Sequence, residues 1–146
     1  MNLAIACDHG GLALKEAVKA HLTECGHQVR DFGTDSPDSC DYPDFAVPAA
    51  RAVAAGEYDR GILICTTGIG MSMVANKIPG IRCALCHDLL SASLTRRHNN
   101  TNVLAMGQGI IGVNLALEIV DVWLTTEFEG GRHQRRIDKV NALDAK

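Results

Sequence analysis

Short apolar runs alternate with longer segments of helical period along the whole chain. The five apolar runs show no polar alternation and are rich in Val, Ile, Ala and Cys, which is typical of strands buried on both faces. The helical segments repeat apolar residues every three or four positions, and the two kinds of segment exchange at Gly, Asn or Asp. This order predicts a parallel sheet covered by helices on both faces and joined by right-handed crossovers.

The pattern predicts one domain over residues 1–146 with a three-layer, Rossmann- or flavodoxin-like α/β fold. It comprises a five-stranded parallel sheet and a C-terminal helix. The expected strands are residues 3–7, 29–32, 61–65, 82–86 and 103–106. A polar loop, residues 33–42, precedes the second helix. The expected helices are residues 12–24, 43–55, 88–98 and 110–124, a short helix that ends before Pro79, and a last one after Gly130 and Gly131 that runs toward Lys146.

Charge and composition exclude several classes of function. With 14 Lys and Arg against 17 Asp and Glu, the formal net charge is -3, so bulk electrostatics recruits neither nucleic acid nor an anionic membrane. The apolar stretch at the N-terminus has no basic region before it and is too short for a secretion signal or a membrane span. The expectation is therefore a cytoplasmic protein, with its six cysteines reduced.

Ligands of open parallel sheets bind beyond the carboxyl ends of the strands, which directs attention to the end of the third strand. Free backbone N–H groups at a helix start stabilise a thiolate, and a glycine-rich turn can hold a phosphate or a developing oxyanion. The alternatives are a small buried thiol and an ordinary tight turn. The turn matches neither the dinucleotide fingerprint nor the P-loop. The residues concerned are Cys65, Thr66, Thr67, Gly68, Ile69 and Gly70.

Candidate acid–base residues lie at two other places, after the first expected strand and at the end of the fourth expected helix. Asp8 and His9 follow the first strand and would enter the same crevice as Cys65. His98 and Asn99 end the fourth helix. Histidine is a typical general acid near neutral pH, although a histidine at a helix end also serves as a partner of the helix dipole.

A phosphate clamp is the second functional hypothesis that the residue types support. Arg132 and Arg136 are four positions apart behind two glycines, so on a helix both guanidinium groups project from one face. Arg135 points elsewhere. The alternative is a solvated basic helix.

The string Cys83-Ala84-Leu85-Cys86-His87 matches the c-type haem attachment motif, but it lies within an expected buried strand. Its two cysteines would face opposite sides of the sheet, which argues against a shared metal ion and for core packing. The remaining cysteines, Cys25 among them, show no ligand spacing.

Five separate sequence blocks are spread along nearly the whole chain: CDHGG at 7–11, DYPDF at 41–45, GILICTTGIGMSMVANKIPGIR at 61–82, RRHNNTNVLAMG at 96–107 and EGGRHQRR at 129–136. Together and in this order they resemble the type B ribose-5-phosphate isomerases, of the sugar-phosphate isomerase family that includes galactose-6-phosphate isomerase subunits. The resemblance implies reversible conversion of ribose 5-phosphate to ribulose 5-phosphate through an enediolate, with no metal or organic cofactor. The alternatives are a six-carbon sugar phosphate such as allose 6-phosphate, a free aldose, or a phosphate- or nucleotide-binding module without catalysis.

The resemblance also implies a role for each candidate residue and a homodimer or dimer of dimers. The Cys65 loop of one chain would meet the His98–Asn99 segment of its neighbour. Cys65 would move the proton between C2 and C1, residues 67–70 would form the anion hole, and His98 with Asp8 would open the furanose ring. The sugar and its phosphate would be bound by Tyr42, Asn99, His9, Arg132 and Arg136.

Two positions depart from the pattern of these isomerases. Thr66 stands where relatives commonly have glycine, and this difference could alter the preference for a sugar. Gly109 stands where many relatives carry an arginine, and this difference could weaken phosphate binding or favour an unphosphorylated sugar.

Overall fold

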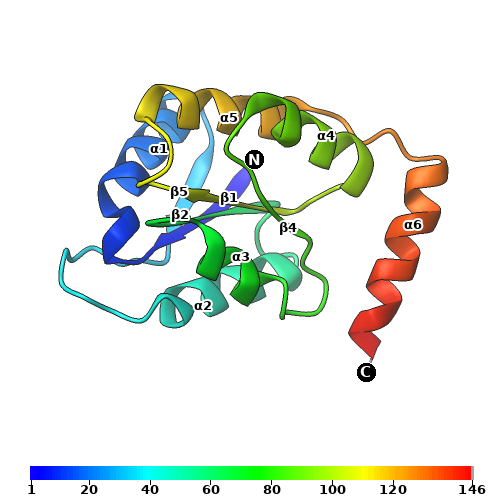
Figure 1. Ribbon diagram of the computed structural model, residues 1–146, viewed down its shortest axis with the longest axis horizontal. Helices are drawn as coiled ribbons and strands as arrows, with labels where there is room; N and C mark the ends of the chain where they lie inside the picture. The colour runs from blue at the N-terminus through cyan, green and yellow to red at the C-terminus, as the bar shows by residue number, and fades with distance from the viewer. Residues whose placement is uncertain (146) are drawn as a thin grey trace.

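In the computed structural model, which describes residues 1–145, five parallel strands form one sheet in the middle of the molecule (Figure 1). Along the sheet they follow the order β2-β1-β3-β5-β4, so the last strand lies between the third and the fourth. The predicted five-stranded α/β fold is confirmed. The strands are β1 (Asn2–Cys7), β2 (Gln28–Asp31), β3 (Arg60–Cys65), β4 (Cys83–Leu85) and β5 (Val103–Gly107).

Helices cover both faces of this sheet (Figure 1). One face packs against α1 (Leu12–Glu24), α4 (Leu89–Asn99) and α5 (Val113–Thr125), and the other against α2 (Tyr42–Ala54) and α3 (Ile69–Ala75). Two short 3-10 turns, η1 (His9–Gly11) and η2 (Ala142–Ala145), complete the elements. Among residues 1–145, no helix combines the length and the apolar character that a membrane crossing requires.

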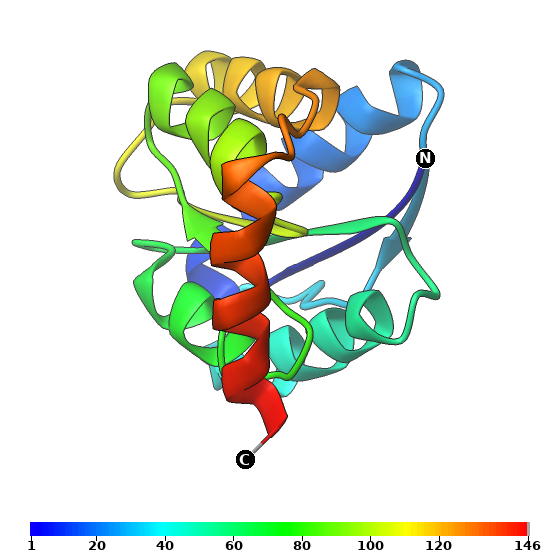
Figure 2. The ribbon, with the colours of Figure 1, turned by 90° about the vertical axis from the view of Figure 1, so that its right-hand side faces the viewer.

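The last helix, α6 (Arg132–Asn141), runs beside the edge of the sheet, from the layer of α4 down past β4 (Figure 2). Lys146, the end of the predicted C-terminal helix, lies outside the described residues. The prediction placed the start of α5 too early. The N–H groups of Ile110 and Ile111 both donate to the Gly107 carbonyl, which closes a turn, so the helix begins only at Val113.

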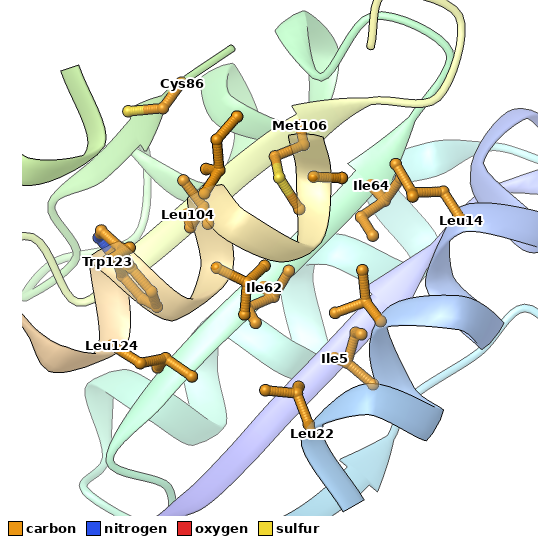
Figure 3. Close-up of a cluster of buried hydrophobic side chains, with 14 of the residues drawn as sticks. Ile5, Leu14, Leu22, Ile62, Ile64, Cys86, Leu104, Met106, Trp123 and Leu124 are labelled. Carbon is orange, nitrogen blue, oxygen red and sulfur yellow. The ribbon is translucent and has the colours of Figure 1, made fainter. Parts of the chain in front are cut away.

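Residue size differs between the two faces of the central strands. Large side chains such as Ile5, Ile62 and Leu104 point toward α1 and α5, where they form one cluster with the fully buried Trp123 (Figure 3). Alanines of β1 and β5 point to the other face and let α2 and α3 pack closely. Because side chains alternate along a strand, Cys65, which follows Ile64, points to the α2–α3 face.

The structure also buries a charge that the helical pattern of α1 did not predict. Lys15 is fully buried, and its ammonium contacts Asp31 at 2.9 Å and the Thr34 carbonyl at 2.6 Å. Burial opposes the charged form of Lys15, but hydrogen bonds to Asp31 and Glu16 outweigh it and raise the lysine's pKa. In the same way, Lys15 and Lys19 lower the pKa of Asp31 against the effect of its burial. The ion pair therefore ties α1 to the end of β2.

Asp31→Asn is expected to destabilise the protein by about 3 kcal/mol at neutral pH, because it leaves the buried Lys15 ammonium without its main counter-charge. Because the pKa of Asp31 is lowered on folding, its contribution is complete above the unfolded pKa of about 3.9 and is lost as pH falls through the lower folded value. Urea unfolding from pH 7 to pH 3 measures this.

Glu16→Gln is the matched control, because Glu16 contacts the same ammonium from a half-exposed position. It should cost less than about 1 kcal/mol. A loss for Asp31→Asn that is as small as this, or that stays the same at every pH, would contradict the prediction.

Candidate active site

Two neighbouring strands bring the first group of candidate residues to the carboxyl edge of the sheet. β2 lies on one side of β1, whereas β3, β5 and β4 lie on the other. The direction in which strands are added to the sheet therefore reverses between β1 and β3. In parallel sheets, ligands bind at the carboxyl ends of the strands beside such a switch point. The Asp8 N–H donates to the Ile64 carbonyl at 3.3 Å, so the loops after both strands lie together. We call the following residues the thiol half-site: Asp8, His9, Tyr42 and residues 65–70.

The turn after β3 wraps around the Cys65 sulfur. The Gly68 N–H donates to Cys65 Sγ at 3.1 Å. Gly68 has a φ of +74°, and a Cβ there would lie 2.8 Å from the Met106 carbonyl carbon, so only glycine fits. The N–H groups of the first turn of α3 have no acceptor within the helix. The turn can therefore place N–H donors around an oxyanion beside the thiol.

The other members of the thiol half-site surround this turn. Asp8 is buried, and its Oδ1 accepts the Gly10 N–H at 2.9 Å. His9 is exposed, and its Nδ1 accepts the Cys40 N–H at 3.2 Å. The ring of Tyr42 lies directly over Gly70, where a Cβ would come within 2.8 Å of the ring.

The second group of candidates lies where α4 ends and α6 begins. The imidazole of His98 stacks on that of His133, with ring centroids 4.3 Å apart and planes within 13°. Arg97 Nε donates to Glu129 Oε1 at 2.6 Å, and the Glu129 N–H donates to the Arg97 carbonyl. These contacts hold the start of α6 against the end of α4.

Arg132 and Arg136 are exposed on α6, and Asn99 is exposed at the end of α4. Together with His98 they form what we call the basic half-site. A cavity of about 530 Å³ adjoins Asn99 between α6 and the start of β4. Cys65 and Asp8 do not line this cavity.

One chain does not bring the two half-sites together. α4 ends just before β5, at the amino edge of the sheet, whereas Cys65 pairs with Gly107 at the carboxyl edge. At a rise of about 3.3 Å per residue, β5 alone separates the two edges by about 13 Å. His98 and Asp8, expected to act on one furanose ring, therefore lie apart within the chain.

The structure places two histidines at these half-sites that received no role from the sequence. His133 is buried beside His98, on the same face of α6 as Ile137, four residues on. Burial, together with the nearby His98 and Arg132, lowers the pKa of His133. The spacing of His133 and Ile137 on one face of the helix was the available signal.

The other histidine, His87, follows β4 at the carboxyl edge. Its Nε2 accepts the Gly107 N–H at 2.9 Å. Burial lowers the pKa of His87 and so favours the neutral ring that accepts this bond. A Cβ on Gly107 would lie 2.7 Å from Thr67 Cα, so the backbone that His87 holds supports the turn after Cys65. The carboxyl-edge rule, applied to β4, could have identified it.

The two departures from the isomerase pattern are neighbours in space. Thr66 Oγ1 lies against Gly10, and Thr66 Cγ2 would be 3.0 Å from a Cβ at Gly109. A side chain at 109 would therefore press on Thr66. The threonine directs its side chain toward these two glycines.

The cysteines of the haem-like string have the predicted structural role. Cys86 packs among the large side chains of one face, and Cys83 packs against the opposite core cluster. Burial raises the pKa of Cys86 to about 11, so it remains a thiol.

Comparison with known proteins gives a consistent result. A family model described as Ribose/Galactose Isomerase matches residues 3–140. Ribose-5-phosphate isomerase B of Escherichia coli is 50% identical over 143 residues, which cover 98% of this chain and 96% of that protein.

Two solved structures have nearly the same fold. Ribose-5-phosphate isomerase B of Clostridium thermocellum has a TM-score of 0.98 and 48% identity, and covers 99% of this chain and 98% of its own. The enzyme of Mycoplasma genitalium with bound ribulose-5-phosphate has a TM-score of 0.96 and 43% identity, and covers 99% and 97%.

Proposed function

The chain belongs to the ribose/galactose isomerase family, and we propose that it is an aldose–ketose isomerase that interconverts ribose 5-phosphate and ribulose 5-phosphate. The observation that carries this proposal is the Cys65 thiol, which accepts the Gly68 N–H at 3.1 Å at the switch point of the sheet. A module that only binds phosphate needs no thiol there. Removal of a proton next to a carbonyl requires both a base and fixed donors for the oxygen that becomes negative.

The proposed reaction begins with ring opening. His98 donates a proton to the ring oxygen, while Asp8 accepts the proton of the C1 hydroxyl, which yields the open aldehyde. The thiolate of Cys65 then removes the proton on C2, and the resulting charge on O1 is stabilised by N–H groups of residues 67–70. The proton of the C2 hydroxyl then passes to O1, and return of the first proton from Cys65 to C1 gives the ketose. Tyr42 and Asn99 contact the sugar, and His9 binds the phosphate with Arg132 and Arg136.

We infer that a second copy of the chain completes each site. The base and the ring-opening acid must reach neighbouring atoms of one sugar, yet the two half-sites occupy opposite edges of the sheet. An isologous dimer would place the basic half-site of each subunit against the thiol half-site of its partner, twice. The exposed Arg132 and Arg136 would then supply remote binding energy that positions the reacting carbons.

A panel of sugars tests the proposed substrate. Initial rates are compared for ribose 5-phosphate, allose 6-phosphate and free ribose, with ribulose 5-phosphate in the reverse direction. The highest kcat/KM is expected for the five-carbon phosphate pair. A higher value for allose 6-phosphate or a free aldose would assign the site to that sugar instead and would give Thr66 and Gly109 a role in specificity.

His98→Asn is expected to lower kcat for ribose 5-phosphate about a hundredfold, within the usual contribution of a general acid. The kcat for ribulose 5-phosphate, which forms no furanose ring, should fall much less. The equilibrium constant fixes the ratio of the two kcat/KM values, so the variant must change both by the same factor. The difference between the two directions is therefore expected in kcat alone. Stopped assays in both directions measure it, and equal losses of kcat would argue for a structural role of His98.

The variant Arg132→Ala with Arg136→Ala is expected to raise KM for ribose 5-phosphate at least about a hundredfold, since each of the two charge-assisted hydrogen bonds contributes about 1.5–3 kcal/mol. Turnover of free ribose, where measurable, should hardly change. Arg135→Ala removes an exposed arginine from the same helix and should leave KM unchanged. An unchanged KM in the double variant would show that Arg132 and Arg136 are solvated surface residues that do not bind the phosphate.

A further inference from the structure

A cluster of three metal-ligating side chains lies between α1 and α5, away from both half-sites. His21 Nε2 is 2.7 Å from Asp121 Oδ1, and Cys25 Sγ is 3.8 Å from His21 Nε2. All three ligand atoms lie within 4.8 Å of one another. The sequence did not predict this cluster, because Asp121 is distant in the chain and no second cysteine stands at ligand spacing from Cys25.

The fold explains why these side chains meet. His21 and Cys25 are four residues apart at the end of α1, so they project from the same face of that helix. Asp121 lies in the later half of α5, which packs beside α1 on the same face of the sheet. Cys25 and Asp121 are exposed, and His21 is partly exposed, so an ion can reach all three from solvent.

We propose that His21, Cys25 and Asp121 form a binding site for Zn²⁺. Zinc accepts imidazole nitrogen, thiolate sulfur and carboxylate oxygen in one tetrahedral site, whereas Mg²⁺ and Ca²⁺ require mainly oxygen. On binding, the Cys25 thiol releases its proton to solvent, and the thiolate and the Asp121 carboxylate together neutralise the two charges of the ion. Three protein ligands leave the fourth position to water.

A second cluster of ligating side chains lacks the geometry for such a site. His98, Glu129 and His133 also have ligand atoms within 4.8 Å of one another, but the two imidazoles stack within 13° of parallel. A ring nitrogen directs its lone pair within the plane of its ring, and two nearly parallel planes do not meet at one ion. The α1–α5 cluster has no such stacking, because it contains a single imidazole.

The consequence of zinc binding is a clamp between α1 and α5. An ion that binds the folded state and not the unfolded chain raises stability according to its concentration and affinity. Because Cys25 directly precedes the turn into β2, the clamp acts at the amino edge of the sheet, opposite the thiol half-site. Zinc is therefore expected to raise the Tm without being needed for isomerase activity.

Cobalt and zinc titrations of the chelator-treated protein test the proposal. Co²⁺ should bind with a sulfur-to-cobalt charge-transfer band and tetrahedral d–d absorption, and Zn²⁺ should displace it and raise the Tm. Cys25→Ser should abolish the charge-transfer band. It should also weaken zinc binding at least about tenfold, since loss of even outer-shell partners commonly costs 10–100-fold. Asp121→Asn should weaken zinc binding but keep the band.

Cys40→Ser is the matched control. Cys40 Sγ lies 3.7 Å from His9 Nδ1, and no third ligand atom in residues 1–145 completes a group there. This variant should keep the band and the Tm shift. Unchanged isomerase activity of metal-free Cys25→Ser would show that the variant is folded. A band that survives in Cys25→Ser, or a native protein that binds neither ion, would overturn the proposal and leave His21 and Asp121 as an ordinary ion pair.

Discussion

Cys65→Ala is expected to lower the rate of isomerisation at least a hundredfold, about the smallest contribution of a well-placed base, and to leave ligand binding nearly intact. In the proposed mechanism, the thiol acts only on the carbon that loses its proton. Phosphate and hydroxyl contacts come from other residues, so the affinity for an inert alditol phosphate should barely change. Rates in both directions and calorimetric titration of the analogue measure the two quantities separately.

Cys86→Ala is the matched control for this variant. Cys86 is also a buried thiol near the carboxyl end of a strand, but it packs into the core on the α1–α5 face. It should retain normal turnover. The assignment of Cys65 as the base is wrong if Cys65→Ala keeps more than a few per cent of the native rate, or if it loses turnover only because the analogue no longer binds.

The position of Cys65 could be predicted because it depends on local pattern. The apolar run that ends at Cys65 has no polar alternation, and the glycines after it end the strand. The carboxyl-edge rule then places the thiol and Asp8 at neighbouring strand ends for any parallel order that pairs β1 with β3. Local pattern also marks the ends of α1 and α4, because the glycine and the asparagine that follow them, Gly26 and Asn100, adopt positive φ.

Properties that depend on the order of the strands could not be predicted in this way. No local signal places β5 between β3 and β4, and this order decides which helix ends lie near one another. Lys15 reads as a solvated residue of an amphipathic helix, yet the end of β2 provides Asp31 and the loop after it provides the Thr34 carbonyl for its ammonium. Similarly, the sequence places His133 on the same helix face as Ile137, but only the packing of α6 against the end of α4 brings its ring onto that of His98.

The separation of the two half-sites leads to the other large expected effect, recovery of ribose 5-phosphate turnover from two variants that have each lost it. Cys65→Ala and His98→Asn subunits are mixed in equal amounts, dissociated and allowed to reassociate. In a two-fold dimer with shared sites, a mixed dimer has one site with both lesions and one site with neither. Random pairing makes half of the dimers mixed, so about a quarter of the native activity should return.

The control is a pair of lesions in the same half-site, Cys65→Ala mixed with Asp8→Asn. Every site of that mixed dimer contains one damaged thiol half-site, so no activity beyond that of the parents should appear. Mass spectrometry of differently tagged subunits establishes that exchange has occurred in both mixtures. If subunits exchange and the Cys65→Ala and His98→Asn mixture recovers nothing, the base and the acid come from one chain, and the shared-site model is wrong.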